Sequence, residues 1–209
     1  PFTENDVKTR LCDHITAGKH SSELFCETAI DWLKDYNCDD PFFTYISFMA
    51  PHDPRTMPDK FLDMYNPEEI ELPENFIKEH PFDFGVSEIR DEVLAPYPRT
   101  EEEIKRHIAE YYGMISHLDH ELGKVIETLK EIGQYENTII IFAADNGLGL
   151  GQHGLMGKQN VYEHSIRVPL IFSGPAIPEN KLCDEYVYIL DIYPTLCEIL
   201  GLDIPKTVE

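Results

Sequence analysis

The chain has 209 residues, of which 42% are hydrophobic and 27% charged, so it can bury the core of one sizeable α/β domain or of two small ones. Its 39 acidic residues outnumber 17 basic ones, and the formal net charge of −22 disfavours a nucleic-acid partner because the long-range field repels phosphate. No apolar run of about eighteen residues occurs, so we expect no membrane-spanning helix and no membrane partner.

The first half of the chain predicts one helix, one buried strand and a long irregular excursion. Residues 1–20 are polar and irregular, and residues 22–37 then carry apolar side chains at helical spacing. Residues 42–48, within PFFTYISFMA, are apolar and β-rich, which is typical of a buried strand. Prolines recur through residues 53–99, which we predict to be extended apart from a short helix at 60–65. A connection of that length is often functional.

The strongest predicted element is a long helix in the middle of the chain. Thr100 and Glu103 form a capping pattern at its start, and Gly133 is a natural stop. We expect His117 and His120 on its solvated face, although their spacing would also allow metal binding. One face repeats apolar residues every three or four positions: Ile104, Ile108, Tyr111, Ile115, Leu118, Leu122, Val125 and Leu129.

Two further strands and a helix complete the predicted order. Residues 138–144 and 167–175 are apolar and end on polar or glycine residues. A last helix is expected at 192–200, with Asp191 as its N-cap. Because strands alternate with helices, we predict an α/β fold in which helices pack on a mostly parallel sheet.

The cysteines indicate neither a disulfide framework nor a zinc site. There are five, at Cys12, Cys26, Cys38, Cys183 and Cys197, and none shows CxxC spacing. Cys26 and Cys197 lie in helix-like apolar patterns and are expected in the core. Unpaired cysteines weakly favour a reducing compartment such as the cytoplasm.

Polar groups follow two of the predicted strands. The strand at 42–48 leads into His52, and the strand at 138–144 leads into Asp145 and Asn146. Ligands bind beyond the carboxyl ends of strands in open α/β sheets, so these side chains can meet. Asp145 and Asn146 offer hard oxygen donors, which suit Ca²⁺ or Mg²⁺ and suit zinc poorly. A plain Asn-Gly turn is the alternative interpretation.

The stretch FAADNGLGLGQHGLMGK, residues 142–158, holds five of the twelve glycines. Glycines let backbone N–H groups approach a ligand, and Lys158 supplies a point charge that suits an anionic oxygen. His52, between two prolines, is either a proton donor or anion contact, or an ordinary surface histidine. For His153 the structural interpretation is favoured, and Arg55 is either structural or on the substrate side.

Three segments together resemble the sulfatase family of the alkaline phosphatase superfamily. They are PFFTYISFMAPHDP, IIIFAADNGLGLGQHGLMGKQNVYEHSIRVPLIFSGP and ILDIYPTLCEILGL, which occur in the family's order from about Ser21 onward. The resemblance implies a sulfuric ester hydrolase with Ca²⁺, or alternatively Mg²⁺, at the carboxyl edge of the sheet. It implies that Asp145 and Asn146 are metal ligands, that Lys158 contacts the sulfate near the leaving oxygen, and that His52 protonates the leaving alcohol.

The sequence departs from the family's pattern in one important respect. The family's nucleophile is a formylglycine made within a Cys/Ser-x-Pro/Ala-x-Arg motif, and none of the five cysteines has that context. The preceding Asp-Asp metal pair and the small C-terminal subdomain are also missing. The resemblance therefore implies that residues 1–209 are the middle-to-late part of a sulfatase catalytic domain, inactive alone, with formylglycine expected upstream.

Two other functions stay open at this point. A phosphodiesterase or phosphonate monoester hydrolase of the same superfamily often carries Asp-His at the second metal position, so Asn146 favours sulfate. A non-catalytic, acidic cation-binding module is allowed by the missing nucleophile.

We expect a small sulfated substrate, a sugar or an aryl or steroid sulfate, with specificity shaped by residues 53–99. Family members are often exported, and exposed sheet edges would favour self-association.

Overall fold

The computed structural model describes residues 18–37, 40–83, 85 and 87–208, so Cys12, Cys38 and most of the irregular segment 1–20 lie outside it. Short 3₁₀ helices occur at η1 (Pro67–Glu69), η2 (Glu92–Leu94), η3 (Tyr135–Asn137) and η4 (Ile189–Asp191). Within the described ranges, every helix is too short or too polar to cross a membrane. The longer elements are α2 (Ser21–Asp35), α3 (Asp59–Leu62), α4 (Glu101–Glu131), β1 (Ile140–Ala143), α5 (Glu163–Ile166), β2 (Leu170–Ser173) and α6 (Ile192–Ile199).

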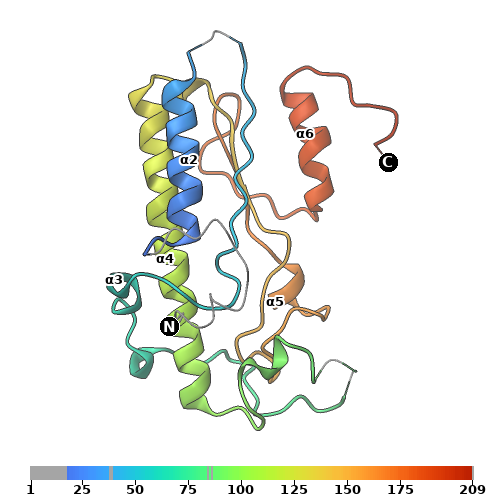
Figure 1. The fold of residues 1–209 in the computed structure, drawn as a ribbon. Helices are drawn as coiled ribbons and strands as arrows, with labels where there is room; N and C mark the ends of the chain where they lie inside the picture. The colour runs from blue at the N-terminus through green and yellow to red at the C-terminus, as the bar shows by residue number, and fades with distance from the viewer. Residues whose placement is uncertain (1–17, 38–39, 84, 86, 209) are drawn as a thin grey trace, which may run out of the picture.

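The predicted long helix is confirmed as α4, the longest element of the described residues, and α2, α3 and η1 all contact it. Thr100 caps it, since its Oγ1 accepts the backbone N–H of Glu103 at 3.2 Å. It ends two residues before Gly133, which has a φ of +70°. Figure 1 shows α2 lying alongside α4, with α6 standing apart on the other side of the molecule. Four buried side chains fill the α2–α4 contact: Cys26, Leu33, Val125 and Leu129.

The prediction that His117 and His120 lie on the solvated face of α4 is correct for His120 and wrong for His117. His120 is exposed, but only 1% of His117 is accessible, because α2 packs over the side of α4 that carries it. Conversely, Ile115 of the predicted apolar stripe is 41% exposed. The physical reason is that α4 is contacted by α2, α3 and η1 together, so its buried surface is wider than one apolar stripe.

The predicted buried strand at 42–48 is wrong, and only alternate side chains of the segment are packed. The segment is extended but has no ladder partner among the described residues. A strand needs inter-strand hydrogen bonds from a neighbour, and a sequence pattern does not supply one. One set of alternate side chains, Phe42, Ile46 and Phe48, packs on the α2–α4 cluster. The other set, including Phe43, Tyr45 and Met49, is exposed.

The two remaining predicted strands are present but pair antiparallel. Ile140 lies opposite Ser173, and Ala143 lies opposite Leu170. Parallel neighbours are usually joined by a crossover helix, whereas the connection from β1 to β2 holds a glycine loop and only the four-residue α5. The predicted mostly parallel sheet is therefore not confirmed, because the described residues form one two-stranded antiparallel sheet.

The shorter predicted elements agree with the structure. The helix expected at 60–65 is α3, shifted slightly toward the N-terminus, and the last predicted helix is α6, with Asp191 at the N-cap position. Cys26 and Cys197 are buried, as expected. These elements depend on local pattern, which explains why the sequence predicts them well.

A second core cluster joins α4 to the glycine-rich loop. It contains Ala95, Ile104, Ile108, Leu150 and Met156, so it combines the excursion, the first turns of α4 and the loop. The loop approaches α4 closely: a Cβ added to Gly151 would lie 2.6 Å from Ile104 Cγ2, and Gly151 has a φ of +96°. Packing against α4 therefore requires glycine at position 151, whether or not the loop also binds a ligand.

Candidate active site

Asp145 and Asn146 follow the end of β1 and begin the glycine-rich loop. Oδ1 of Asp145 accepts the backbone N–H of Asn146 at 3.0 Å, and the Asn146 side-chain amide donates to Gly147 O at 2.8 Å. The backbone N–H of Gly147 donates to Ser165 O at 2.8 Å. A Cβ added to Gly147 would lie only 2.0 Å from His164 O. Close approach of the chain at 164–165 therefore requires glycine directly after the two candidate ligands.

The far side of the loop is held by a buried carboxylate, Glu92. Its side chain is 2% exposed, and it accepts the backbone N–H groups of Met156 at 2.9 Å and Gly157 at 2.8 Å. The loop also closes on itself, since Gly149 N–H donates to Gly157 O at 2.8 Å. This arrangement fixes the backbone directly before Lys158.

Arg99 balances the charge of Glu92. Its side chain is fully buried and donates to Glu92 at 2.7 Å, to Gly154 O at 3.1 Å and to Ala95 O. Tyr97 packs its ring 3.7 Å from the guanidinium and donates its hydroxyl to Glu92 at 3.1 Å. A buried ion pair is tolerated only when such additional hydrogen bonds satisfy both partners.

Asp91 lies next to Glu92 and connects two parts of the candidate site. One of its oxygens accepts from Arg90 at 2.7 and 3.0 Å, and the other accepts from Gln159 at 3.2 Å. Burial acts to raise the pKa of Asp91, but the hydrogen bonds from Arg90 and Gln159 and the charges of Arg90 and Lys158 outweigh it. The pKa is therefore lowered, and Asp91 is an anion.

His52 reaches the same cluster from the other side. Its Nε2 lies 3.2 Å from Nη2 of Arg90, and its Nδ1 lies 2.9 Å from Oδ1 of Asp53. Gln159 Oε1 also accepts the backbone N–H of Lys158 at 3.1 Å. A continuous series of contacts therefore runs from His52 through Arg90 and Asp91 to the segment of Lys158.

The two remaining candidates lie in packed positions. His153 has a φ of +54° and stacks on the Tyr162 ring at 4.0 Å, with Nε2 3.1 Å from the Asn75 amide nitrogen. Arg55 points to α4, where its guanidinium contacts Nδ1 of His107. Both side chains have structural contacts, so a role on the substrate side stays a prediction for Arg55.

Sequence reasoning missed the residues that support the loop. Glu92, Asp91, Arg90 and Arg99 all come from the excursion at 53–99, whose local pattern predicts nothing about burial. The run Arg-Asp-Glu was the only available signal, and charged triplets are usually solvated. His164 was also missed: burial, and then the charge of His153, lower its pKa to about 4.

Comparison with known proteins decides the family. The family model described as Sulfatase matches residues 2–202. The chain belongs to the sulfatase family. The resemblance seen in the sequence is thereby confirmed.

Two sulfatases of known sequence are similar to this chain over most of its length. A sulfatase of Formosa agariphila is 35% identical over 182 residues, which cover 83% of this chain and 36% of that protein. An arylsulfatase of Clostridium perfringens is 33% identical over 199 residues, covering 91% and 40%. The chain thus spans well under half the length of these relatives.

A solved structure supports the same fold. A phosphonate monoester hydrolase of Agrobacterium radiobacter superposes with a TM-score of 0.77 at 28% identity, covering 87% of this chain and 39% of that one. The predicted alkaline-phosphatase-like fold is confirmed by this similarity, whereas the predicted mostly parallel arrangement of the strands is not.

Proposed function

We propose that this chain forms one half of a sulfatase active site and that the complete protein hydrolyses small sulfate esters, of sugars or aryl alcohols. The observation that carries the proposal is the series of contacts from His52 through Arg90 and Asp91 to Gln159. It supports a shared site because it links the histidine loop to the residue that follows Lys158. Membership of the family supports the reaction class.

The donors after β1 suit a hard divalent cation. Asp145 is exposed and carries a carboxylate, and Asn146 uses its amide nitrogen for Gly147 O, so the amide oxygen is the atom available to a cation. Carboxylate and amide oxygens match Ca²⁺, with Mg²⁺ as the alternative, but they are two of the six to eight or so oxygens that Ca²⁺ takes. The bound cation would stabilise negative charge on the sulfate oxygens.

Lys158 and His52 have different roles in the proposed reaction. The Lys158 ammonium stabilises the charge that develops on the sulfuryl oxygens and the leaving oxygen. Asp53, at 2.9 Å from Nδ1 of His52, orients the ring and favours a proton on that nitrogen. For Nε2 to pass a proton to the leaving alcohol, the ring must first carry a second proton on Nε2, and the Arg90 guanidinium, which only donates, must move off that nitrogen when substrate binds. The formylglycine nucleophile is expected from sequence outside these 209 residues.

Asp91 and Glu92 act indirectly in this proposal. Glu92 fixes the loop backbone at Gly157, and Asp91 places a negative charge beside Lys158 and Arg90. Both are positioning residues, since neither is expected to touch the sulfate.

Phosphonate ester hydrolysis is the second candidate, because one similar structure is a phosphonate monoester hydrolase. Assaying the intact protein with nitrophenyl sulfate and with a nitrophenyl phosphonate ester separates the two. We expect the sulfate to be preferred, and Lys158→Ala to lower its kcat/KM by about 10²- to 10³-fold, as for loss of one charge-stabilising donor. Lys181→Ala, at an exposed lysine, is the control. Preference for the phosphonate, or full activity of Lys158→Ala, would contradict the proposal, and absence of any turnover would favour a cation-binding module.

A further inference from the structure

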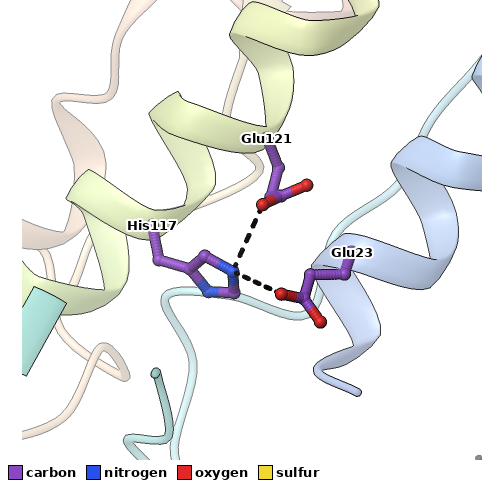
Figure 2. Close-up of side chains that lie close together, drawn as sticks. All are labelled: Glu23, His117 and Glu121. Carbon is purple, nitrogen blue, oxygen red and sulfur yellow. Dashed lines mark ion pairs between the residues drawn. The ribbon is translucent and has the colours of Figure 1, made fainter. Parts of the chain in front are cut away.

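A second group of ligand-type side chains lies between α2 and α4, outside the candidate active site. Figure 2 shows the imidazole of His117 facing the carboxylates of Glu23 and Glu121. Nε2 of His117 lies 3.9 Å from Oε1 of Glu23 and 3.7 Å from Oε1 of Glu121. One ligand atom from each residue lies within 4.8 Å of the other two.

The imidazole nitrogen at the centre of this group is buried without a partner. His117 is 1% exposed, and its Nε2 has no hydrogen-bond partner within the described part of the chain. Buried polar atoms are nearly always paired, since an unpaired one loses its bonds to water without replacement. The rings of His20 and Phe61, centred 4.8 and 4.9 Å away, pack against His117 and hold its orientation. The nitrogen therefore points at two carboxylates that are too distant for hydrogen bonds.

We propose that Glu23, His117 and Glu121 bind one divalent transition-metal ion, for which Zn²⁺ is the best match. Imidazole nitrogen with carboxylate oxygen suits zinc, whereas Ca²⁺ takes oxygen alone. His117 and Glu121 are four residues apart on α4, a spacing that places two ligands on one helix face. Bonds of about 2.0–2.2 Å in a tetrahedral site put ligand atoms about 3.4 Å apart. The two separations from Nε2, 3.7 and 3.9 Å, need to contract by a few tenths of an ångström, and the two carboxylate oxygens, which lie within 4.8 Å of each other, by at most about 1.4 Å.

The charge balance of the group also favours a cation. Lys124 donates to both oxygens of Glu121 at 2.7 Å and is the positive charge that holds the buried carboxylate. Its side chain is 47% exposed, so it can turn into solvent when a metal replaces it. Lys124 is then a competitor of the metal rather than part of its site. A bound ion would crosslink α2 to α4.

The test is a zinc titration of the intact protein, first freed of metal and then held in excess Ca²⁺ so that oxygen-only sites are filled. Calorimetry should show one Zn²⁺ per chain, and Zn²⁺ should raise the melting temperature. His117→Gln and Glu23→Gln should each weaken binding at least about tenfold, as loss of a ligand requires. His120→Gln, at the exposed histidine one turn along α4, is the matched control and should bind normally. Glu23 is only partly buried, so Glu23→Gln serves if His117→Gln fails to fold.

A variant of Lys124 separates a metal site from a plain ion-pair cluster. Lys124→Met removes the competing charge and should tighten zinc binding severalfold while the metal-free protein becomes less stable. Absence of zinc binding, or binding unaffected by both ligand variants, would overturn the proposal. Weaker binding in Lys124→Met would do the same, because it would mean that Lys124 supports the site instead of competing for it.

Discussion

Glu92 and Gly157 are joined by a hydrogen bond of 2.8 Å, from the backbone N–H to Oε1, although they lie 65 residues apart in sequence. A Cβ on Gly157 would lie 2.7 Å from the same oxygen. The proline-rich excursion thus fixes the glycine loop one residue before Lys158. The position of the candidate catalytic lysine depends on a buried ion pair as much as on its own loop.

Substitution of Glu92 should destabilise the protein. Glu92→Gln keeps the side-chain shape but leaves the guanidinium of Arg99 buried without its counter-charge. We expect the free energy of unfolding in urea to fall by about 3–5 kcal/mol, as for a broken buried ion pair. Glu71→Gln, at an exposed glutamate of the same excursion, should change it by less than about 0.5 kcal/mol. Equal stability of the two variants would contradict the structural role of Glu92.

A methyl group at Gly147 should disturb the candidate metal ligands. In Gly147→Ala the new Cβ would meet His164 O at 2.0 Å, and a backbone oxygen cannot move aside cheaply. We expect a loss of about 1–3 kcal/mol and weaker Ca²⁺ binding by the intact protein, since Asn146 is the preceding residue. Gly123→Ala is the matched control: its Cβ meets open space within α4, and alanine should stabilise that helix by about 0.5–1 kcal/mol. Calorimetric titration and urea unfolding of both variants check the expectation.

His107 should make stability fall at acidic pH. Burial, and then the positive charges of Arg55 and Arg106, lower its pKa to about 4, against about 6.5 in the unfolded chain. Arg55 donates to Nδ1, so the neutral ring is the form that fits the fold. Between pH 6.5 and 4 the unfolded chain takes up a proton on His107 that the folded protein does not. The contribution of His107 to the free energy of unfolding is therefore lost progressively as the pH falls.

The size of this effect can be measured by difference. Between pH 7 and pH 4.5 we expect the free energy of unfolding to fall by about 2 kcal/mol more in the wild type than in His107→Gln. His164, whose pKa is also lowered to about 4, is present in both proteins and cancels. Identical pH dependence of the two would show that His107 titrates normally in the folded state.

The 209-residue chain alone should bind Ca²⁺ poorly and show no sulfatase turnover. Asp145 and Asn146 supply one charged and one neutral donor, and affinity follows the number of charged ligands and the rigidity of the site. We expect a dissociation constant of about millimolar order or weaker by calorimetry. A micromolar site that disappears in Asp145→Ala would mean that these residues already build a complete metal site.

Local signals in the sequence determined several features correctly. Thr100 and Gly133 bracket α4, and the apolar repeat between them sets its length, because capping and helical periodicity depend on neighbours within a few residues. The motifs around Asp145, Asn146 and Lys158 were sufficient to identify the family, which the family model confirms over residues 2–202. Their convergence with His52 on one sulfate stays a prediction.

Other features depended on contacts between distant parts of the chain. The antiparallel pairing of β1 with β2, the burial of His117 beneath α2 and the hydrogen bonds from Met156 and Gly157 to Glu92 involve residues 27 or more positions apart. An acidic residue in a proline-rich loop is normally solvated, and only the packed neighbours Arg99 and Tyr97 make burial of Glu92 favourable. Periodicity records which side of an element is apolar, whereas the tertiary structure decides which element covers it and which charges it pairs.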